Sequence, residues 1–380
     1  MWAFWKAPLV LLSFVPVVLA FLSHPLRLPE LDAVIEADVL RRVPHRILEN
    51  CSPGYQITPA PDGETVFINC VRKLARFEKR DGRWTETASY DPHGEWDEAA
   101  FDFEAHRAYL YIGGDRRMET IDLDTMTAVR SMELDENVFR PRHTGIYQAI
   151  DEDSNRLFLG ENNGLVAALR TDDLSKIAGR LAVPEDDTVW RVLFAESRNE
   201  LYVLAEHALL VLDGDDLSVR RRADFTDAAV DMLLDESSGS VFVSFPAAMR
   251  VHRYDAATFE NLERFPAPAA VRALAVDHAR QWLVMASYNG VVSVREVRTR
   301  RLIKRFRVPP IVRRIALFPE NGTMIVTSGK NPALEVNYAD FDPPFDLTDL
   351  MLRWSERAFR FFSLSHGSDG HQRGLEGRGP

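Results

Sequence analysis

Short apolar segments recur along this chain at a nearly constant interval, and polar turn residues separate them. The middle residues of consecutive segments are about 40 to 49 positions apart. This interval is long enough for four short strands with their turns. The segments are VFI at 66–68, AYLYI at 108–112, LFL at 157–159, LYV at 201–203, VFV at 241–243, LVM at 283–285 and MIV at 324–326.

The fifth repeat shows most clearly how one unit is built. An apolar strand leads through a polar turn into a second strand that alternates around Phe242, and two further strands complete an antiparallel sheet. Asp, Asn, Gly and Ser fill the turns because short hairpins need local side-chain hydrogen bonds or a positive φ. Seven such units predict an all-β fold, a seven-bladed β-propeller. The strands of this repeat are expected at 229–234, 240–244, 249–254 and 259–265.

The last repeat lacks a fourth strand. It ends at Asp342, Pro343 and Pro344, and proline does not continue strand pairing. An extra strand-like segment at 39–48 precedes the first full repeat. We predict that this segment supplies the outer strand of the last blade, which closes the ring and removes a free sheet edge. The propeller is therefore expected to span 39–341.

An apolar run over 7–22, preceded by Lys6, marks the N-terminus. The segment 1–22 is a cleaved signal peptide, a retained membrane anchor or a buried core segment. Both membrane alternatives export the rest of the chain, because Lys6 favours a cytoplasmic N-terminal side. With a linker over 23–38, we expect a periplasmic or extracellular propeller, free or held at the membrane by residues 2–22.

Beyond the propeller, residues 342–364 have the apolar spacing of an amphipathic helix. This helix either packs against the propeller or lies on the membrane surface, where Arg353, Arg357 and Arg360 on its other side would suit it. The tail 365–380 is rich in Gly, with Ser and His, and is expected to be disordered.

The net charge and the two cysteines limit which partners and which cellular compartment the protein can have. A formal net charge of −11 and a pI near 5.5 argue against nucleic-acid binding, which favours a basic face. A hairpin about the turn 59–63 brings Cys51 and Cys70 near each other. They either form a disulfide, which export would permit, or remain two partly buried thiols.

Two units illustrate a family resemblance: RLFLGENNGLVAALRTDDL from Arg156 and LYVLAEHALLVLDGDDL from Leu201. Their pattern resembles the YVTN-type repeat and, more broadly, the quinoprotein-like and lactonase-like seven-bladed propellers, over residues 40 to 340. The resemblance implies the fold, whereas such propellers include enzymes, electron-transfer partners and binding modules. The blade turns lack the tryptophan of quinone-binding enzymes, and no CxxCH haem motif is present, so we expect no cofactor.

Candidate binding residues are expected where the inner strands begin, because loops from all blades converge there. Counting five residues back from each early turn puts Arg191, Arg272 and Arg314 at one equivalent position. Guanidinium groups pair well with carboxylates or phosphates, so this pattern favours an anion site; the alternative is local salt bridges with aspartates. The residues Arg313, Arg142 and His143 lie in or next to the same class of loop and complete the candidate site.

The remaining aromatic and polar residues of these loops give weaker indications of a binding site. Trp190 precedes an inner strand and is expected to pack between blades. The histidines are scattered, so no metal site is predicted. Loops on the same side bring further rim candidates, namely Asp115, Asn162, His207, Tyr288 and Lys330.

Two functions from different classes follow. The first is a non-enzymatic binding or scaffold protein near a membrane, whose partner is a protein or an anionic small molecule on the channel face. The second is a lactonase-type hydrolase with Asp97, His143 and Glu161 as candidate acid–base residues. We expect the first, because no catalytic motif accompanies the repeats.

Overall fold

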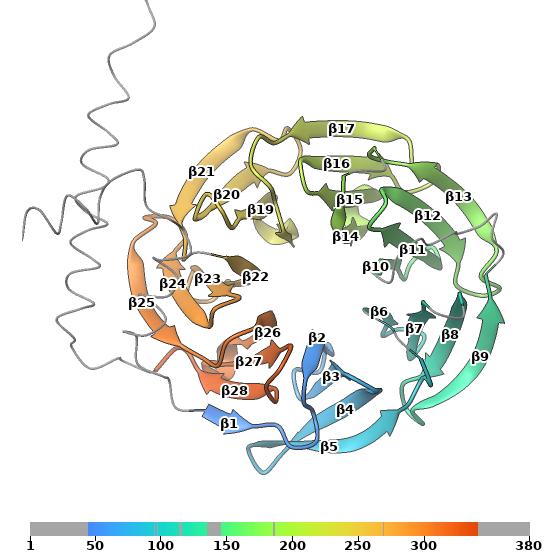
Figure 1. The fold of residues 1–380 in the computed structure, drawn as a ribbon, viewed down its shortest axis with the longest axis horizontal. Coiled ribbons are helices and arrows are strands. Elements are labelled where there is room, and N and C mark those ends of the chain that lie inside the picture. Colours follow the sequence, from blue (N-terminus) through green and yellow to red (C-terminus); the bar gives the residue numbers. More distant parts are fainter. Residues whose placement is uncertain are drawn as a thin grey trace, which may run out of the picture.

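Seven antiparallel sheets of four strands each are arranged in a ring around a central axis (Figure 1). The structure, a computed structural model, describes residues 45–94, 96, 98–113, 116–134, 146–184, 187–268 and 270–340. Each sheet is one blade, so the predicted seven-bladed all-β architecture is confirmed. The helical segments of the described residues are three 3-10 turns: η1 (Glu196–Arg198), η2 (Glu236–Ser238) and η3 (Pro319–Asn321).

Each blade runs from an inner strand at the axis to an outer strand at the circumference (Figure 1). The inner strands of blades 1 to 7 are β2 (Gly54–Pro59), β6 (Ala99–Asp102), β10 (Ile146–Asp151), β14 (Val189–Ala195), β18 (Asp231–Asp235), β22 (Val271–Asp277) and β26 (Val312–Phe318). The second strands are β3 (Thr65–Cys70), β7 (Arg107–Ile112), β11 (Arg156–Glu161), β15 (Glu200–Ala205), β19 (Ser240–Phe245), β23 (Trp282–Ser287) and β27 (Thr323–Ser328). The third strands are β4 (Lys73–Arg80), β8 (Arg117–Asp122), β12 (Leu165–Arg170), β16 (Ala208–Asp213), β20 (Arg250–Asp255), β24 (Val291–Glu296) and β28 (Leu334–Asn337). The outer strands are β5 (Arg83–Tyr90), β9 (Thr127–Glu133), β13 (Lys176–Leu181), β17 (Val219–Asp224), β21 (Asn261–Pro266), β25 (Leu302–Arg307) and, in blade 7, β1 (His45–Ile47).

The turn between the third and outer strands explains why aspartate recurs there. In blade 2, Asp122 Oδ1 accepts the backbone N–H groups of Asp124 and Thr125 at 3.1 and 2.8 Å, and Asp255 makes the same two bonds in blade 5. The bond from Thr125 lowers the pKa of the Asp122 carboxyl, because it stabilises the carboxylate. Met126 then takes a left-handed φ of 52°. Local side-chain chemistry thus makes this turn.

Apolar side chains pack between neighbouring blades rather than in one central core. Separate buried clusters lie between consecutive blades around the ring, the last of them between blades 7 and 1. Each blade therefore needs both neighbours to cover its two faces. The residues at the centres of the second strands are all buried: Phe67, Tyr109, Phe158, Tyr202, Phe242, Val284 and Ile325.

Basic side chains tie neighbouring blades together at their outer halves. Each donates a hydrogen bond to a backbone carbonyl in the closing turn of the next blade. A charged donor makes a stronger bond than a neutral one, so these contacts hold the blades in fixed relative positions. The pairs are Arg76 with Leu123 at 2.9 Å, Arg130 with Asp172, Arg180 with Leu217 at 3.0 Å, Arg221 with Ala256 at 3.4 Å and Lys304 with Ala339 at 2.6 Å.

Blade 7 is completed by the start of the described chain. Strand β1 pairs with β28 in antiparallel orientation, with His45 opposite Val336. The N–H of Leu48 then donates to the carbonyl of Ala333 at 2.9 Å. The prediction that an N-terminal outer strand closes the last blade is confirmed; the first part of that predicted strand, 39–44, lies outside the described residues.

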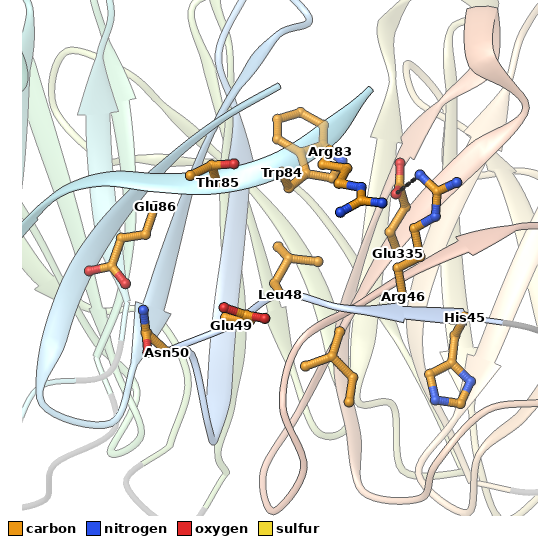
Figure 2. A pocket seen from close by; sticks show the side chains of 11 residues that line it. His45, Arg46, Leu48, Glu49, Asn50, Arg83, Trp84, Thr85, Glu86 and Glu335 are labelled. Carbon is orange, nitrogen blue, oxygen red and sulfur yellow. Dashed lines mark ion pairs between the residues drawn. The ribbon is translucent and has the colours of Figure 1, made fainter. Parts of the chain in front are cut away.

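A groove of about 630 Å³ follows the seam between β1 and β5 (Figure 2). Arg46 and Glu335, on its blade 7 side, form an ion pair at 4.0 Å. On the blade 1 side, Glu86 pairs with Lys73 at 2.5 Å. Glu335 also lies 3.7 Å from Lys79 of blade 1, so one ion pair crosses the seam between the two blades.

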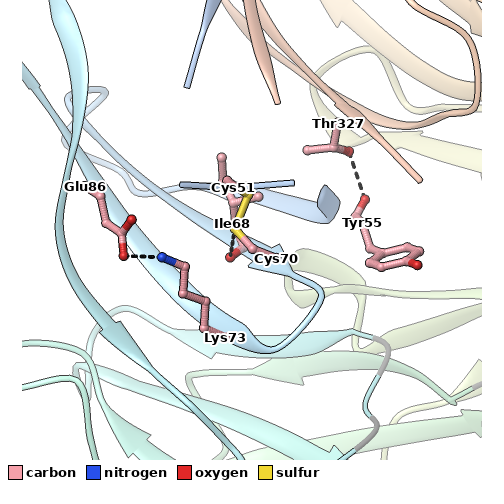
Figure 3. Close-up of a disulfide and its surroundings, with 7 residues drawn as sticks. All are labelled: Cys51, Tyr55, Ile68, Cys70, Lys73, Glu86 and Thr327. Carbon is pink, nitrogen blue, oxygen red and sulfur yellow. Dashed lines mark hydrogen bonds and ion pairs between the residues drawn. A yellow bond between two sulfur atoms is a disulfide. The ribbon is translucent and has the colours of Figure 1, made fainter. Parts of the chain in front are cut away.

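The closing seam is also bridged between blades 7 and 1. The sulfur atoms of Cys51 and Cys70 are 2.02 Å apart, and their Cα atoms are 5.2 Å apart (Figure 3). Cys70 ends β3 in blade 1, whereas the carbonyl of Cys51 accepts a hydrogen bond from Ala333 of blade 7 at 3.0 Å. Thr327 Oγ1 of blade 7 donates to the carbonyl of Tyr55 in blade 1 at 2.9 Å (Figure 3). The segment that completes blade 7 is thus joined covalently to blade 1.

The predicted segments at the two chain ends, 1–22 with its linker 23–38 and the helix 342–364 with its tail 365–380, lie outside the described residues. Within the part of the chain that the structure describes, no helix has the length and apolar character that a bilayer crossing requires.

Replacing both cysteines, in a Cys51→Ala/Cys70→Ala variant, is expected to lower the free energy of unfolding of the oxidised protein by about 3 kcal/mol. The reason is that the bond closes a loop of 19 residues in the unfolded chain. Urea unfolding, with and without reductant, measures the change. Reductant should lower the midpoint of the natural protein and leave that of the variant unchanged; a natural protein insensitive to reductant would contradict the prediction.

Candidate functional site

Four inner strands carry one extra residue near their start: in β2 of blade 1, Tyr55 and Gln56 lie opposite the single residue Asn69, and the other three strands are β14, β22 and β26. The pairing of inner and second strands skips Trp190 in blade 4, Arg272 in blade 6 and Arg313 in blade 7. A bulge of this kind re-aims the extra side chain relative to the regular alternation of the strand. All three side chains line one cavity at the axis of the ring, which we call the mouth cavity.

The strand register corrects the predicted alignment of Arg191, Arg272 and Arg314. Arg191 and Arg314 pair with their second strands, whereas Arg272 is the extra residue of its strand. The alignment was wrong in blade 6 because Asp277, which resembles a turn residue, is the last residue of β22. Counting five residues back from Asp277 gave Arg272, whereas the residue that corresponds to Arg191 and Arg314 in the strand register is Ala273. Arg272 therefore corresponds to Arg313, and the four arginines form two pairs with different surroundings.

Arg191 and Arg314 belong to a group of interacting residues next to the bulges, which we call the polar belt. Arg314 Nη2 lies 2.5 Å from Glu98 Oε1, and Arg191 lies 3.6 Å from both Glu98 and Asp231. Two guanidinium groups thus face two carboxylates, and their charges balance. The belt consists of Gln56, Glu98, Gln148, Arg191, Asp231 and Arg314.

Amide side chains join the belt to the backbone. Gln56 donates to the carbonyl of Ala99 at 2.8 Å and accepts from its N–H at 2.6 Å. Gln148 donates to the carbonyl of Glu98 at 2.5 Å. Because Gln56 and Gln148 come from blades 1 and 3 and both bond to blade 2, the belt also fixes the inner strands of three blades.

Burial makes the charges of the belt depend on one another. Asp231 is 3 % exposed, and this burial raises the pKa of its carboxyl, although Arg191 and Arg314 oppose the effect. For Arg314, burial alone would lower the pKa, but Glu98 and Asp231 raise it above the usual value. The pKa of the Asp231 carboxyl and that of the Arg314 guanidinium group therefore each depend on the opposite charges around them.

Two cavities lie along the axis. The mouth cavity has a volume of about 250 Å³, and a second, inner cavity has about 340 Å³. Gln56, Glu98 and Arg314 line both, so the polar belt lies between them. The mouth cavity is otherwise lined by Tyr55, Tyr147, Asn162, Trp190, Val230, Arg272 and Arg313.

The arginines of the mouth cavity rest on aromatic rings. The guanidinium carbon of Arg272 lies 5.5 Å from the ring centre of Trp190 and 5.8 Å from that of Tyr288. Arg313 lies 5.5 Å from the ring centre of Tyr55. Among the described residues, no carboxylate forms an ion pair with either guanidinium group. Burial, and then the charge of Arg313, lower the pKa of Arg272.

The structure brings together only part of the predicted site. Arg142 and His143 lie outside the described residues. Asn162 lines the mouth cavity and Tyr288 contacts Arg272, as expected for rim residues. Trp190 packs between blades 4 and 5, as predicted, and also forms a wall of the cavity.

Residues that the sequence reasoning missed are the tyrosines of the mouth and the carboxylate of the belt. A signal for the tyrosines was present, because the pair Tyr-Gln occurs at 55–56 and again at 147–148. Both pairs put a tyrosine in the mouth cavity and a glutamine in the belt. Glu98 had no such repeated signal, because no other blade has a glutamate at this place.

None of the three candidate acid–base residues is seen beside the two axial cavities in the described part of the chain. Glu161 is buried and lines neither cavity. Asp97 lies outside the described residues, like His143. In the described ranges, no three His, Cys, Asp or Glu side chains come together in a way that could hold a metal ion.

Removing the belt arginine, in an Arg314→Met variant, is expected to lower the free energy of unfolding by about 3–5 kcal/mol, because Glu98 and Asp231 are left buried with too little positive charge. Arg272→Met is the matched control. It should leave stability unchanged or raise it, because burial and Arg313 already disfavour the charge of Arg272. Urea unfolding of both variants measures the difference, and equal losses would contradict the assignment of two kinds of arginine.

A comparison with solved structures finds a similar fold. The structure is similar to that of the WD40 beta propeller domain of Doa1, with a TM-score of 0.62 and 13 % sequence identity over 78 % of this chain and 96 % of that domain. Neither a protein-family model nor a curated protein sequence matches the chain. At this level of identity the similarity concerns the fold alone. The chain therefore has a seven-bladed β-propeller fold with a WD40 propeller as a structural neighbour.

Proposed function

We propose that this protein is a non-enzymatic binding or scaffold propeller, exported and associated with a membrane, that takes a protein partner or an anionic ligand at the mouth of its channel. Propellers commonly serve as scaffolds or binding modules, because loops from every blade converge on one face. The YVTN-type and quinoprotein-like resemblance of the repeats is compatible with this role, and so is a WD40 neighbour.

The observation that carries the proposal is the contrast between the two pairs of arginines. In the belt, Arg191 and Arg314 are balanced by Glu98 and Asp231. In the mouth cavity, Arg272 and Arg313 have no ion pair with a described carboxylate. Positive charge that is held on aromatic rings and left unbalanced beside an open cavity supports recognition of a negatively charged group.

A lactonase-type hydrolase is the less supported alternative. Such chemistry needs an available acid–base group beside the substrate. Of the described residues that line the mouth cavity, Glu98 alone carries a carboxylate, and it is engaged by Arg314 at 2.5 Å. The arrangement therefore favours binding over hydrolysis.

Export is supported by the apolar run over 7–22 behind Lys6. The bond between Cys51 and Cys70 is compatible with an oxidising compartment, because disulfides persist mainly outside the cytosol. Both features favour a periplasmic or extracellular location, with residues 2–22 as the means of holding the protein at a membrane.

Binding at the mouth predicts a crosslink that depends on position and charge. A photoreactive residue in place of Tyr288, which is 39 % exposed beside Arg272, should form an adduct with a partner in cells. The same residue in place of Ile177, which is 38 % exposed on the outer strand of blade 3, is the matched control and should not. The adduct from position 288 should disappear in an Arg272→Glu/Arg313→Glu background; adducts that ignore position or charge, or measured turnover of lactones, would contradict the proposal.

Export predicts that the natural full-length chain is found in the membrane or exported fraction with both cysteines unreactive toward maleimide until reductant is added. Cell fractionation, thiol labelling and N-terminal sequencing measure this, and the N-terminal sequence distinguishes a cleaved signal from a retained anchor. An intact chain in the cytoplasm with two reactive thiols would overturn this part of the proposal.

A further inference from the structure

The surroundings of the mouth arginines determine what kind of group a ligand can bring to them. Arg272 is held against the rings of Trp190 and Tyr288, and Arg313 against that of Tyr55. A ring attracts the positive charge of the guanidinium group, whose five N–H donors lie along planar edges. A carboxylate fits such an edge with two parallel bonds. The mouth cavity therefore offers two positions at which a carboxylate can be bound.

The two arginines also repel each other. Burial is the main reason that the pKa of Arg272 is lowered, and the charges of Arg313 and Arg314 lower it further. Arg314 has its own partner in Glu98, but Arg272 and Arg313 have no described carboxylate between them. A ligand with two negative charges would relieve this repulsion, whereas a ligand with one would relieve only part of it.

The size and walls of the cavity limit the ligand further. A volume of about 250 Å³ lies just below the usual range for pockets that hold drug-sized molecules, and therefore suits a smaller ligand. Gln56, Glu98 and Arg314 of the polar belt form part of the cavity wall. Val230 and the rings of Tyr55 and Trp190 supply apolar wall, which suits a short carbon chain between two acidic ends.

We propose that the mouth cavity binds a group with two carboxylates joined by a short carbon chain, one carboxylate on Arg272 and the other on Arg313. The inference rests on the proposed binding function and names the chemistry of what is bound. A free dicarboxylic acid and the C-terminal acidic residue of a partner chain both present this group.

Isothermal titration of the full-length protein with glutarate tests the chemistry. Glutarate should bind, and pentanoate, which has the same chain and one carboxylate fewer, should bind at least about tenfold more weakly because one charge-assisted pair is lost. The Arg272→Gln and Arg313→Gln variants should each weaken glutarate binding by a similar factor. Arg301→Gln, whose side chain is 72 % exposed in the turn before β25, is the matched control and should bind like the natural protein.

Further arms distinguish the two sources and guard against misfolding. A five-residue peptide that ends in glutamate should bind more tightly than glutarate if the source is a partner chain, and more weakly if it is a free acid; its C-terminal amide should lose binding in either case. Urea unfolding should show that the Gln variants remain folded.

Four outcomes would overturn the inference: equal binding of glutarate and pentanoate, glutarate binding by the Gln variants equal to that by the natural protein, tighter binding of inorganic phosphate than of glutarate, or no glutarate binding at about 10 mM. A position-dependent crosslink at residue 288 together with absent glutarate binding would reject this chemistry alone and leave the binding function standing.

Discussion

The pairing of β1 with β28 is the contact on which the rest of the molecule depends. The two strands come from opposite ends of the described chain, and together they complete blade 7. Every blade buries its faces against two neighbours, so an open ring would expose the apolar faces of blades 7 and 1. Leu48, which is 1 % exposed, and the Cys51–Cys70 bond both lie at this seam. Closure therefore brings a strand pair, an apolar cluster and a covalent bond to one place.

A closed ring creates a second constraint, because it brings the inner strands of all blades to one axis. Polar residues there are shielded from bulk water and must find partners near the axis. The belt satisfies this requirement: Glu98, Asp231, Arg191 and Arg314 come from four blades and balance one another. A balanced group of this kind stabilises the axis and leaves little charge for a ligand.

The positive charges of the mouth cavity, which lie at the bulges, are not balanced by described carboxylates in this way. One inserted residue in blades 6 and 7 lifts Arg272 and Arg313 out of the regular pairing and onto aromatic rings. The pKa of Arg272 is lowered there, which means that its charge is held at a cost in stability. Functional sites commonly accept such a cost, since an unbalanced charge is what a ligand of the opposite sign recognises.

The sequence by itself determined the number of blades, the order of strands in each and the closing turns, because these depend on interactions between residues close together in the chain. The bond from Thr125 to Asp122 spans three positions, and the apolar run around Phe242 lies within one strand. The missing fourth strand of the last repeat was likewise visible as an absence in a regular pattern. Local signals of this kind are enough to predict a propeller.

Only the tertiary structure decided which arginines are balanced and which have no ion pair with a described carboxylate. Arg314 and Glu98 are 216 positions apart, and no local pattern relates them. Arg272 is the extra residue of β22, whereas Arg191 follows the extra residue of β14, and this difference of one position puts the two arginines in different surroundings. The physical reason is that a charge is balanced by whatever lies within a few ångströms in space, and in a closed ring those neighbours come from other blades.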